Sequence, residues 1–244
     1  MPRVAQIMAG NANAKIWHND QVSIGAAGIE DAPIASGASA ERNYGGQSTE
    51  MYVNGTASQV LIRVLNVDAA LGVGATISAA KCSLYNTYYA ANISVSAFRV
   101  LKPWVEGALN GSNPSEGEGC TYNDWSADSK EWGTAGCANA NNSGIDNSAD
   151  GSDYDRWATA EGTTTITAVN TWFSWTISAA VAQGWYDGTY LENGLLIKES
   201  GVNWGGLIPT ENAIAANRPR FSFVYTTGGA PAGGGSNSQI IVID

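Results

Sequence analysis

Alternation of apolar and polar side chains dominates the middle of the chain, between residues 75 and 107. In the first half of this stretch Ala80, Cys82 and Leu84 alternate with polar neighbours, and the same period of two returns after a polar break at 86–92. This period is that of a strand with one buried face and does not suit a helix. We therefore expect two antiparallel strands that form a hairpin in the middle of a β-sandwich.

Further segments of the chain repeat the strand signal. Residues 59–67 are apolar on both faces apart from Arg63, which predicts a strand buried from two sides and a carboxylate or carbonyl partner for the guanidinium. A short helix is expected between Ser178, which can cap it, and Gly188, which can end it. The other expected strands are Met51 and Val53 with their neighbours, 164–177, 195–199 and 219–225. Together these segments predict an all-β chain, an antiparallel jelly-roll-like β-sandwich with one short helix.

Composition divides the chain into four expected parts. An N-terminal arm at 1–39, rich in Ala, Gly and Asn, precedes a β-sandwich domain at 40–227. A Gly/Ser/Pro linker at 228–238 then leads to a C-terminal apolar strand at 239–244. Within the sandwich, residues 107–163 form a long polar and glycine-rich region, and we expect much of it to pack because Tyr and Trp side chains are embedded in it.

The charge balance of the chain bears on its partners. The formal net charge is −10, and only 12 residues are Lys or Arg, which opposes binding to nucleic acid or to anionic lipid. No apolar run approaches the roughly 18 residues of a membrane span. The apolar part of the N-terminus is too short for a signal peptide, so we expect an unprocessed chain. Such a chain suits a protein that is assembled inside a cell and released by lysis.

Three cysteines give an odd count, so a fully paired disulfide framework is excluded. Cys120 and Cys137 lie in one glycine-rich region, and the sequence leaves open whether they form a disulfide. Cys82 has the position of a small core residue on its strand. A zinc ribbon or knuckle is excluded because the chain contains no C-x-x-C.

Several motifs resemble, in their order along the chain, the DNRLRE or disaggregatase-related domain family. The similar elements are N-Y-G-G, M-Y-V-N-G, V-L-I-R-V, A-T-I-S-A-A-K-C-S-L-Y, I-S-V-S-A-F-R-V-L-K-P-W-V-E-G, T-W-F-S-W-T-I, V-A-Q-G-W-Y-D-G, N-G-L-L-I-K-E-S and A-N-R-P-R-F-S-F-V-Y-T. The resemblance covers about residues 40–227, and P-W-x-E-G and N-G-L-L-I-K-E are its most specific parts. It implies a jelly-roll β-sandwich in a surface or extracellular setting, with polysaccharide binding in some relatives. It implies no reaction.

Residues for catalysis are scarce. The one histidine, His18, lies in the N-terminal arm, and the chain contains none of the common hydrolase, metalloprotease, phosphate-loop or dinucleotide motifs. A carboxylate pair for glycoside hydrolysis remains open, because acids are frequent in one loop region and their separation in space decides that chemistry. These acids are Glu106, Glu116, Glu118, Asp124 and Glu131. Solvated loop acids are the simpler interpretation, so we expect no enzyme.

Aspartates cluster around a glycine in the segment D-N-S-A-D-G-S-D-Y-D. Closely spaced Asp, Asn and carbonyl oxygens in a loop can supply the six to eight hard ligands that Ca²⁺ requires. The candidate metal ligands are Asp146, Asp150, Asp153 and Asp155. Turn-forming Asx residues without any metal explain the segment equally well.

Nine tryptophans invite a comparison between core packing and sugar stacking. Trp104 and Trp175 lie on or beside expected buried strands and are predicted core residues. Four others lie in expected loops, where flat apolar rings could bind a carbohydrate. The candidate ligand-binding residues are Trp125, Trp132, Trp157 and Trp204.

Apolar residues at both ends of the chain could mediate assembly. The candidates are Ile16, Trp17, Ile240, Ile241, Val242 and Ile243. The C-terminal strand has two interpretations: it folds back onto its own sandwich, which is the simpler one, or it is donated to a sheet edge of another chain.

From these observations we expect a non-enzymatic structural or attachment module on the surface of a particle, a phage virion, as a capsid decoration or tail-associated protein. Its expected partners are neighbouring subunits and polysaccharide, not nucleic acid or a membrane. The alternative is a carbohydrate-binding module of a secreted or cell-surface protein, and an enzyme acting on polysaccharide is third.

Overall fold

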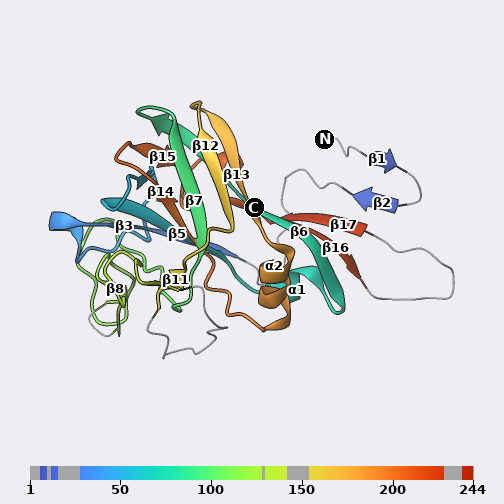
Figure 1. Ribbon diagram of the computed structural model, residues 1–244, viewed down its shortest axis with the longest axis horizontal. Helices are drawn as coiled ribbons and strands as arrows, with labels where there is room; N and C mark the ends of the chain where they lie inside the picture. The colour runs from blue at the N-terminus through green and yellow to red at the C-terminus, as the bar shows by residue number, and fades with distance from the viewer. Residues whose placement is uncertain are drawn as a thin grey trace.

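The computed structural model describes residues 6–9, 12–15, 28–127, 130–141, 154–227 and 238–243. Two antiparallel β-sheets packed face to face form its body (Figure 1). The N-terminal pair of strands, β1 (Gln6–Ala9) and β2 (Ala12–Lys15), forms a small sheet of its own.

One layer is a five-stranded sheet in the order β12-β7-β14-β5-β3. Its strands are β3 (Ile29–Ala35), β5 (Ser58–Val64), β7 (Ile93–Arg99), β12 (Gly162–Ile166) and β14 (Leu195–Glu199). Every pairing in this sheet is antiparallel. Strand β3 begins before residue 40, so the N-terminal arm expected over 1–39 is shorter than the sequence suggests.

The other layer is a six-stranded sheet. It follows the path β17-β16-β6-β15-β4, and β13 pairs with the opposite edge of β6. Its strands are β4 (Met51–Val53), β6 (Ala75–Tyr89), β13 (Thr171–Ile177), β15 (Gly205–Leu207), β16 (Arg220–Thr227) and β17 (Ser238–Ile243). Strands β15 and β16 both lie along the same edge of the long strand β6 and together occupy one strand position.

The strand order confirms the predicted jelly-roll-like sandwich. Along the chain, strands alternate between the layers from β3 to β7 and again from β12 to β15. Strands β7 and β12 follow each other in the five-stranded sheet, and β15, β16 and β17 follow one another in the six-stranded sheet. The resulting orders are β5-β14-β7-β12 in one layer and β4-β15/β16-β6-β13 in the other. Two interleaved four-stranded sheets of this kind are the arrangement of a jelly roll.

The predicted hairpin between residues 75 and 107 is wrong. Strands β6 and β7 have the expected alternation, but β6 belongs to the six-stranded sheet and β7 to the five-stranded sheet. The short connection after Tyr89 therefore crosses between the layers. Strand β6 also extends into the expected polar break and ends at Tyr89. Within it, the buried Asn86 amide donates a hydrogen bond to the Ala168 carbonyl at 2.8 Å.

The main core lies between the two sheets. Val95 and Ile62 enter it from one layer, and Cys82 and Trp175 enter it from the other. All four side chains are fully buried. The indole N–H of Trp175 donates to the Val95 carbonyl at 2.8 Å, which ties the layers together and satisfies its one polar group. The prediction that Trp104 and Trp175 are core residues is confirmed.

A second core covers the outer face of the five-stranded sheet. Leu61 and Leu196 point into it from the strands. Aromatic and cysteine side chains from the segment after β7 cover them: Trp104, Cys120, Trp125, Trp132 and Cys137. The predictions that β5 is buried from two sides and that much of the 107–163 region packs are both confirmed.

Arg63 has the carboxylate partner that its position required. Its Nε donates to Glu30 Oε2 at 2.8 Å, and its guanidinium carbon lies 4.5 Å from the centroid of the Trp104 ring. The two charges pair across strands β3 and β5, where Glu30 is directly opposite Arg63. The ion pair closes one side of the second core.

Helices and short elements complete the fold. Helix α2 (Ala179–Asp187) begins after Ser178, whose hydroxyl accepts from the Val181 N–H at 3.3 Å, and ends at Gly188 with φ of 77°, as predicted. The remaining elements are α1 (Val67–Leu71), η1 (Gly37–Ser39), η2 (Ala215–Asn217), β8 (Asp124–Ser126), β9 (Lys130–Glu131), β10 (Ala140–Asn141) and β11 (Arg156–Trp157). In the described ranges, no helix has the length and apolar character needed to cross a membrane.

Candidate functional site

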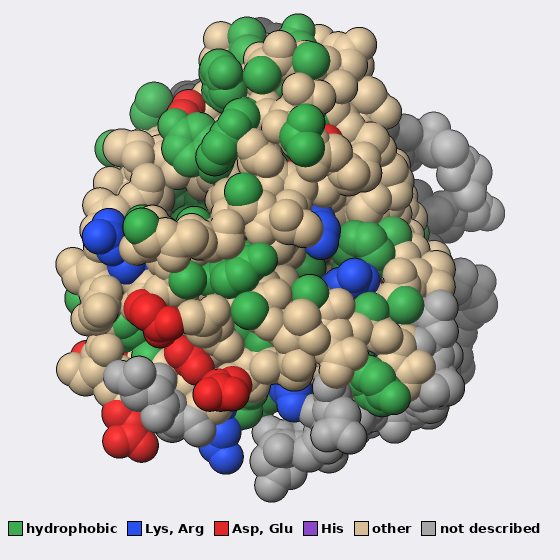
Figure 2. All heavy atoms as spheres, turned by 60° about the vertical axis from the view of Figure 1, so that its left-hand side comes forward, with side chains coloured by type: hydrophobic (Ala, Val, Ile, Leu, Met, Phe, Trp, Pro, Cys, Tyr) green, Lys and Arg blue, Asp and Glu red, His purple; other side chains and the backbone are tan. Residues whose placement is uncertain are grey.

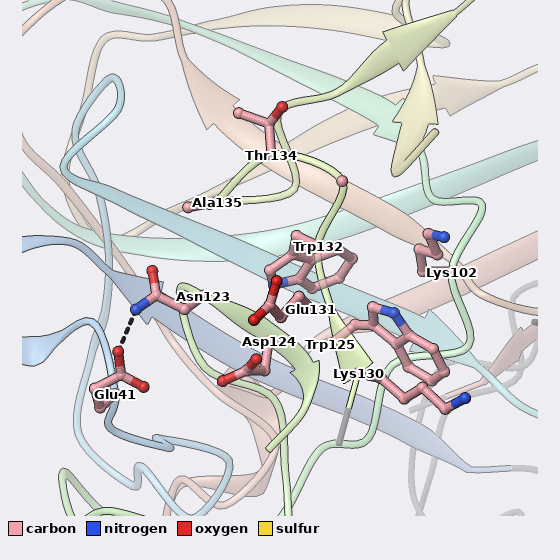
Figure 3. Close-up of a pocket in the computed structure, with 11 residues that line it drawn as sticks. Glu41, Lys102, Asn123, Asp124, Trp125, Lys130, Glu131, Trp132, Thr134 and Ala135 are labelled. Atoms are coloured by element: carbon pink, nitrogen blue, oxygen red, sulfur yellow. Dashed lines mark hydrogen bonds between the residues drawn. The ribbon is translucent and has the colours of Figure 1, made fainter. Parts of the chain in front are cut away.

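An open pocket of about 870 Å³ lies in the segment that covers the five-stranded sheet (Figure 3). We call it the Trp132 pocket. Its lining includes Lys102, Asp124, Trp125, Lys130, Glu131 and Trp132. It therefore brings together two of the four tryptophans predicted to bind a ligand and two of the five acids considered for catalysis.

Strands β8 and β9 build this pocket. Asp124 and Glu131 are cross-strand partners in the pair, so their carboxylates lie on neighbouring strands at the pocket wall. The Asp124 backbone N–H donates to the Thr121 hydroxyl at 3.0 Å, and that hydroxyl approaches the Asp124 carboxylate at 3.3 Å. The remaining loop acids Glu106, Glu116 and Glu118 do not line the pocket.

The two indoles of the Trp132 pocket are mainly structural. Trp132 is 5% exposed and Trp125 is 8% exposed. The indole N–H of Trp132 donates to the Thr121 carbonyl at 3.0 Å, which fixes the ring against the second core. Neither ring presents an open face of the size that stacking on a sugar requires.

A smaller groove of about 380 Å³ lies between the edge strands β3 and β4 of the two layers. We call it the Trp204 groove. Its lining includes Ser36, Tyr44, Gln47, Glu50, Tyr52 and Trp204. Trp204 is 43% exposed and Tyr52 39% exposed, and their rings meet edge to face with centroids 5.8 Å apart. Trp204 is thus the predicted ligand-binding tryptophan with the most accessible ring.

The fourth candidate, Trp157, lies apart from both sites. It is half-buried on β11, with the Arg99 guanidinium carbon 4.8 Å from its ring centroid. Arg99 lies at 4.1 Å from the ring of Tyr190 as well. This stacked arrangement assigns Trp157 a packing role, so the four predicted tryptophans do not form one patch.

Of the four predicted calcium ligands, only Asp155 lies among the described residues. Asp146, Asp150 and Asp153 lie outside the described residues. The buried Asp155 carboxylate accepts backbone N–H groups of Gly133 at 2.6 Å, Asn139 at 2.9 Å and Thr134 at 3.0 Å. Burial raises the pKa of Asp155, and these three hydrogen bonds oppose that rise. Asp155 therefore serves the backbone of the covering segment.

In the part of the chain that the structure describes, no group of three or more His, Cys, Asp or Glu side chains is arranged to hold a metal ion. Cys82, Cys120 and Cys137 are free and buried in the structure, which leaves the disulfide alternative without support. Burial raises the pKa of all three thiols well above its ordinary value.

Four of the six candidate assembly residues lie among the described residues. Ile16 and Trp17 lie outside the described residues, whereas Ile240, Ile241, Val242 and Ile243 belong to β17. Strand β17 pairs with β16 of its own chain in antiparallel register, from Phe221 opposite Ile243 to Thr226 opposite Ser238. The simpler interpretation, in which the C-terminal strand returns to its own sandwich, describes this structure. Strand β2 lies next to β17.

Sequence reasoning missed several residues with unusual surroundings. Tyr52 was available from the strand pattern, because it alternates with the buried Met51 and Val53 and must face outward. Asp31 and Glu106 gave no such signal. Asp31 is fully buried, accepts the Thr210 N–H at 2.7 Å, and donates its own N–H to Glu106 Oε1 at 2.7 Å.

Burial and neighbouring carboxylates act together on these two acids. Burial, with a smaller contribution from Glu211, raises the pKa of Asp31 to about 8. Burial also raises the pKa of Glu106 to about 8. Both acids therefore stay largely protonated in the folded protein at neutral pH, at the edge of strand β3.

Comparison with known proteins assigns no relatives: no protein-family model matches the chain, and no curated protein matches it.

Proposed function

We propose that the chain is a non-enzymatic structural and attachment module on the surface of a particle, specifically a phage virion, as a capsid decoration or tail-associated protein. The observation that supports this proposal is the position of β17, an apolar strand at the end of the six-stranded sheet. A terminal strand at a sheet edge offers main-chain hydrogen-bonding groups to a strand of a neighbouring subunit. The segment before it, 228–237, is rich in Gly.

No catalytic step is part of this proposal. Asp124 and Glu131 share a pocket wall, but Asp124 is 6% exposed and bonded to Thr121, which suits a carboxylate that holds a turn. The single histidine lies outside the described residues. The rigid sandwich, with its two cores, would act as a scaffold that presents its loops and grooves outward.

Immunogold electron microscopy tests the location. Antibodies against the purified chain would be applied to particles isolated from the lysate of the source culture. Gold on the surface of intact virions supports the proposal. Gold confined to cell envelopes, with unlabelled virions in the same preparation, contradicts it and favours the second candidate.

The second candidate function is a carbohydrate-binding module. The specific observation in its favour is the open Trp204 groove, in which an exposed tryptophan and an exposed tyrosine lie beside a carboxylate. Apolar rings next to a few hydrogen-bonding groups are the usual composition of a small-ligand site. A surface attachment module and a carbohydrate-binding module are compatible, because binding to glycans is one way in which a particle attaches.

A further inference from the structure

The most exposed aromatic side chains gather at one place. Among the residues that the structure describes, three aromatic side chains are more than a third exposed: Tyr52 at 39%, Trp204 at 43% and Tyr88 at 45%. They come from β4, from the residue before β15, and from the end of β6. Most aromatic surface in a protein is buried, so a convergence of three exposed rings from distant parts of the sequence needs a ligand-related explanation.

The strand register places two of these rings on the same face. Tyr52 and Tyr88 are the cross-strand partners of Gly206 on its two sides, so both rings flank a position without a side chain. Two strand spacings of about 4.8 Å each separate their backbones by about 10 Å. Trp204 packs edge-on against Tyr52 with an interplanar angle of 81°. The rings therefore border one patch of the sheet around Gly206, which we call the Gly206 surface.

Gly206 makes room for its neighbours in this surface. A Cβ at this position would lie 3.1 Å from Tyr88 Cβ and 3.3 Å from Glu50 Oε2, so these neighbours would have to shift slightly to accept a larger residue. The glycine thus leaves the space between the two tyrosines to the Glu50 carboxylate.

Glu50 supplies the polar group of the Gly206 surface. The Tyr52 hydroxyl donates to Glu50 Oε2 at 2.7 Å, and the Thr87 hydroxyl donates to Glu50 Oε1. Each carboxylate oxygen has further acceptor capacity for hydroxyl donors. Glu50 and Tyr52 also line the Trp204 groove, so the Gly206 surface adjoins this groove, whose lining adds hydroxyl and amide groups such as those of Ser36, Tyr44 and Gln47.

The charge of this surface selects against anions. The lining of the Trp204 groove contains a carboxylate and no Lys, Arg or His. Figure 2 shows hydrophobic side chains gathered at the upper end of the molecule, the end that carries β15 in Figure 1, with the visible Lys and Arg side chains lower down. The net charge of −10 adds long-range repulsion of anionic ligands.

We propose that the Trp204 groove, together with the adjoining Gly206 surface, binds a neutral polysaccharide chain. The ring faces contact the apolar faces of the sugars, and Glu50 accepts hydrogen bonds from sugar hydroxyls. A neutral glycan fits because it offers both flat apolar faces and hydroxyl donors without negative charge. This inference rests on the carbohydrate-binding candidate function and adds the site and the ligand class.

Affinity gel electrophoresis of the full chain tests the inference. The gels would contain a soluble neutral polysaccharide (xylan, galactomannan or mixed-linkage β-glucan) or, for comparison, the anionic polysaccharide alginate. Four variants would be compared with the unchanged protein: Trp204→Ala, Tyr52→Ala, Trp132→Phe and Val73→Ala. Val73 is 99% exposed before the start of β6, at the opposite end of that strand from Tyr88, and serves as the control for loss of an exposed apolar side chain.

The expected result is retardation in at least one neutral gel and none in alginate. Trp204→Ala and Tyr52→Ala should each weaken that retardation at least tenfold, and Val73→Ala should leave it unchanged. Circular dichroism spectra of Trp204→Ala, Tyr52→Ala and Val73→Ala should match, because the changed side chains are exposed.

Three results would overturn the inference in distinguishable ways. Retardation that survives Trp204→Ala but is lost in Trp132→Phe would place carbohydrate binding in the Trp132 pocket. That result would support the candidate function and reject the Trp204 groove as its site. Absence of retardation in every gel, including alginate, would reject the carbohydrate-binding candidate together with the site. Retardation in alginate alone would reject the neutral ligand class.

Discussion

At the residue scale, Asp31 is the side chain with the most unusual surroundings. It is fully buried at the edge of β3, its Oδ1 makes no hydrogen bond within the described part of the chain, and its pKa is raised to about 8 from an ordinary value of 3.8. Between about pH 4 and pH 8 the Asp31 carboxyl is therefore protonated in the folded protein and ionised in the unfolded chain. Stability falls as the pH rises through this window, because the unfolded state is the one that ionises readily.

Asp31→Asn should remove this dependence. Asparagine keeps an acceptor for the Thr210 N–H and never ionises. We expect little change in the free energy of unfolding at pH 4, and stabilisation on the order of 2–4 kcal/mol at pH 9. Urea unfolding of the variant and of the unchanged protein at a series of pH values measures this difference in the free energy of unfolding. A difference between variant and unchanged protein that stays constant from pH 4 to pH 9 would show that Asp31 does not titrate in this range.

Asp155 has the opposite character, because its carboxylate is fully engaged. It accepts three backbone N–H groups from residues 133–139, a stretch that borders the Trp132 pocket. Asp155→Ala leaves these buried donors without a partner, so we expect a loss of about 3 kcal/mol in the free energy of unfolding. Asp155→Asn, which keeps one acceptor oxygen, should lose less.

Denaturant titrations of both Asp155 variants measure these losses. We expect the free energy of unfolding to be lowest for Asp155→Ala, intermediate for Asp155→Asn and highest for the unchanged protein. Equal stability of Asp155→Ala and the unchanged protein would mean that water replaces the carboxylate at no cost. Added calcium should not raise the stability of the unchanged protein through Asp155, because this carboxylate is already occupied.

Residue-level predictions from the sequence succeeded where local chemistry decides the outcome. Ser178 and Gly188 bound helix α2 because cap and φ preferences act over a few residues, and Arg63 has its carboxylate because a guanidinium on an apolar strand needs one. Trp125 and Trp132 were candidate ligand-binding residues because they lie in expected loops, although the same embedded aromatics also predicted that much of their segment packs. They are buried because the segment folds onto the five-stranded sheet, which no local pattern reveals.

At the element scale, alternation predicts that a strand exists but not which sheet it joins. Strands β6 and β7 have one buried face each in either arrangement, so a hairpin and a crossing between layers have the same pattern. The Trp204 groove was inaccessible to sequence reasoning for a related reason. Its rings come from β4 and from the residue before β15, which become neighbours only through the strand order.

Strand β17 covers the outer edge of β16 in the six-stranded sheet. Removal of residues 238–244 should leave the sandwich folded, because β16 remains paired with β6, but should open the outer edge of β16. An open edge is a site for pairing with other chains, so we expect a lower melting temperature and concentration-dependent self-association. Differential scanning fluorimetry and size-exclusion chromatography measure the two effects.

A synthetic peptide with the sequence S-Q-I-I-V-I-D provides the control for the truncated chain. Added in excess, it should restore the melting temperature and suppress self-association, since it can pair with β16 in the same register. A truncated protein that melts like the full chain and stays monomeric would contradict a stabilising role for β17. Such an outcome would also weaken the assembly proposal, which depends on a strand able to pair at this edge.

At the scale of the whole molecule, the two cores make the covering segment part of the fold. Strand β5 sends Val60 and Ile62 into the main core and Leu61 into the second core, so each core stabilises a strand that the other needs. A sandwich without the segment would expose Leu61, Leu196, Ala32 and Ile34 on a sheet face. An exposed apolar face of that kind leads to aggregation or to loss of structure.

Replacement of residues 108–160 by a short Gly-Ser linker tests this interdependence. We expect the shortened chain to lose soluble folded protein, because four apolar side chains of the five-stranded sheet then face water, and each Leu or Ile exposed costs about 1.5–3 kcal/mol. Such a sum is comparable to the whole stability of a domain. Solubility, circular dichroism and the melting temperature report the result. A monomeric shortened protein with an unchanged melting temperature would show instead that the sandwich is complete without its cover, and that the Trp132 pocket belongs to an independent addition.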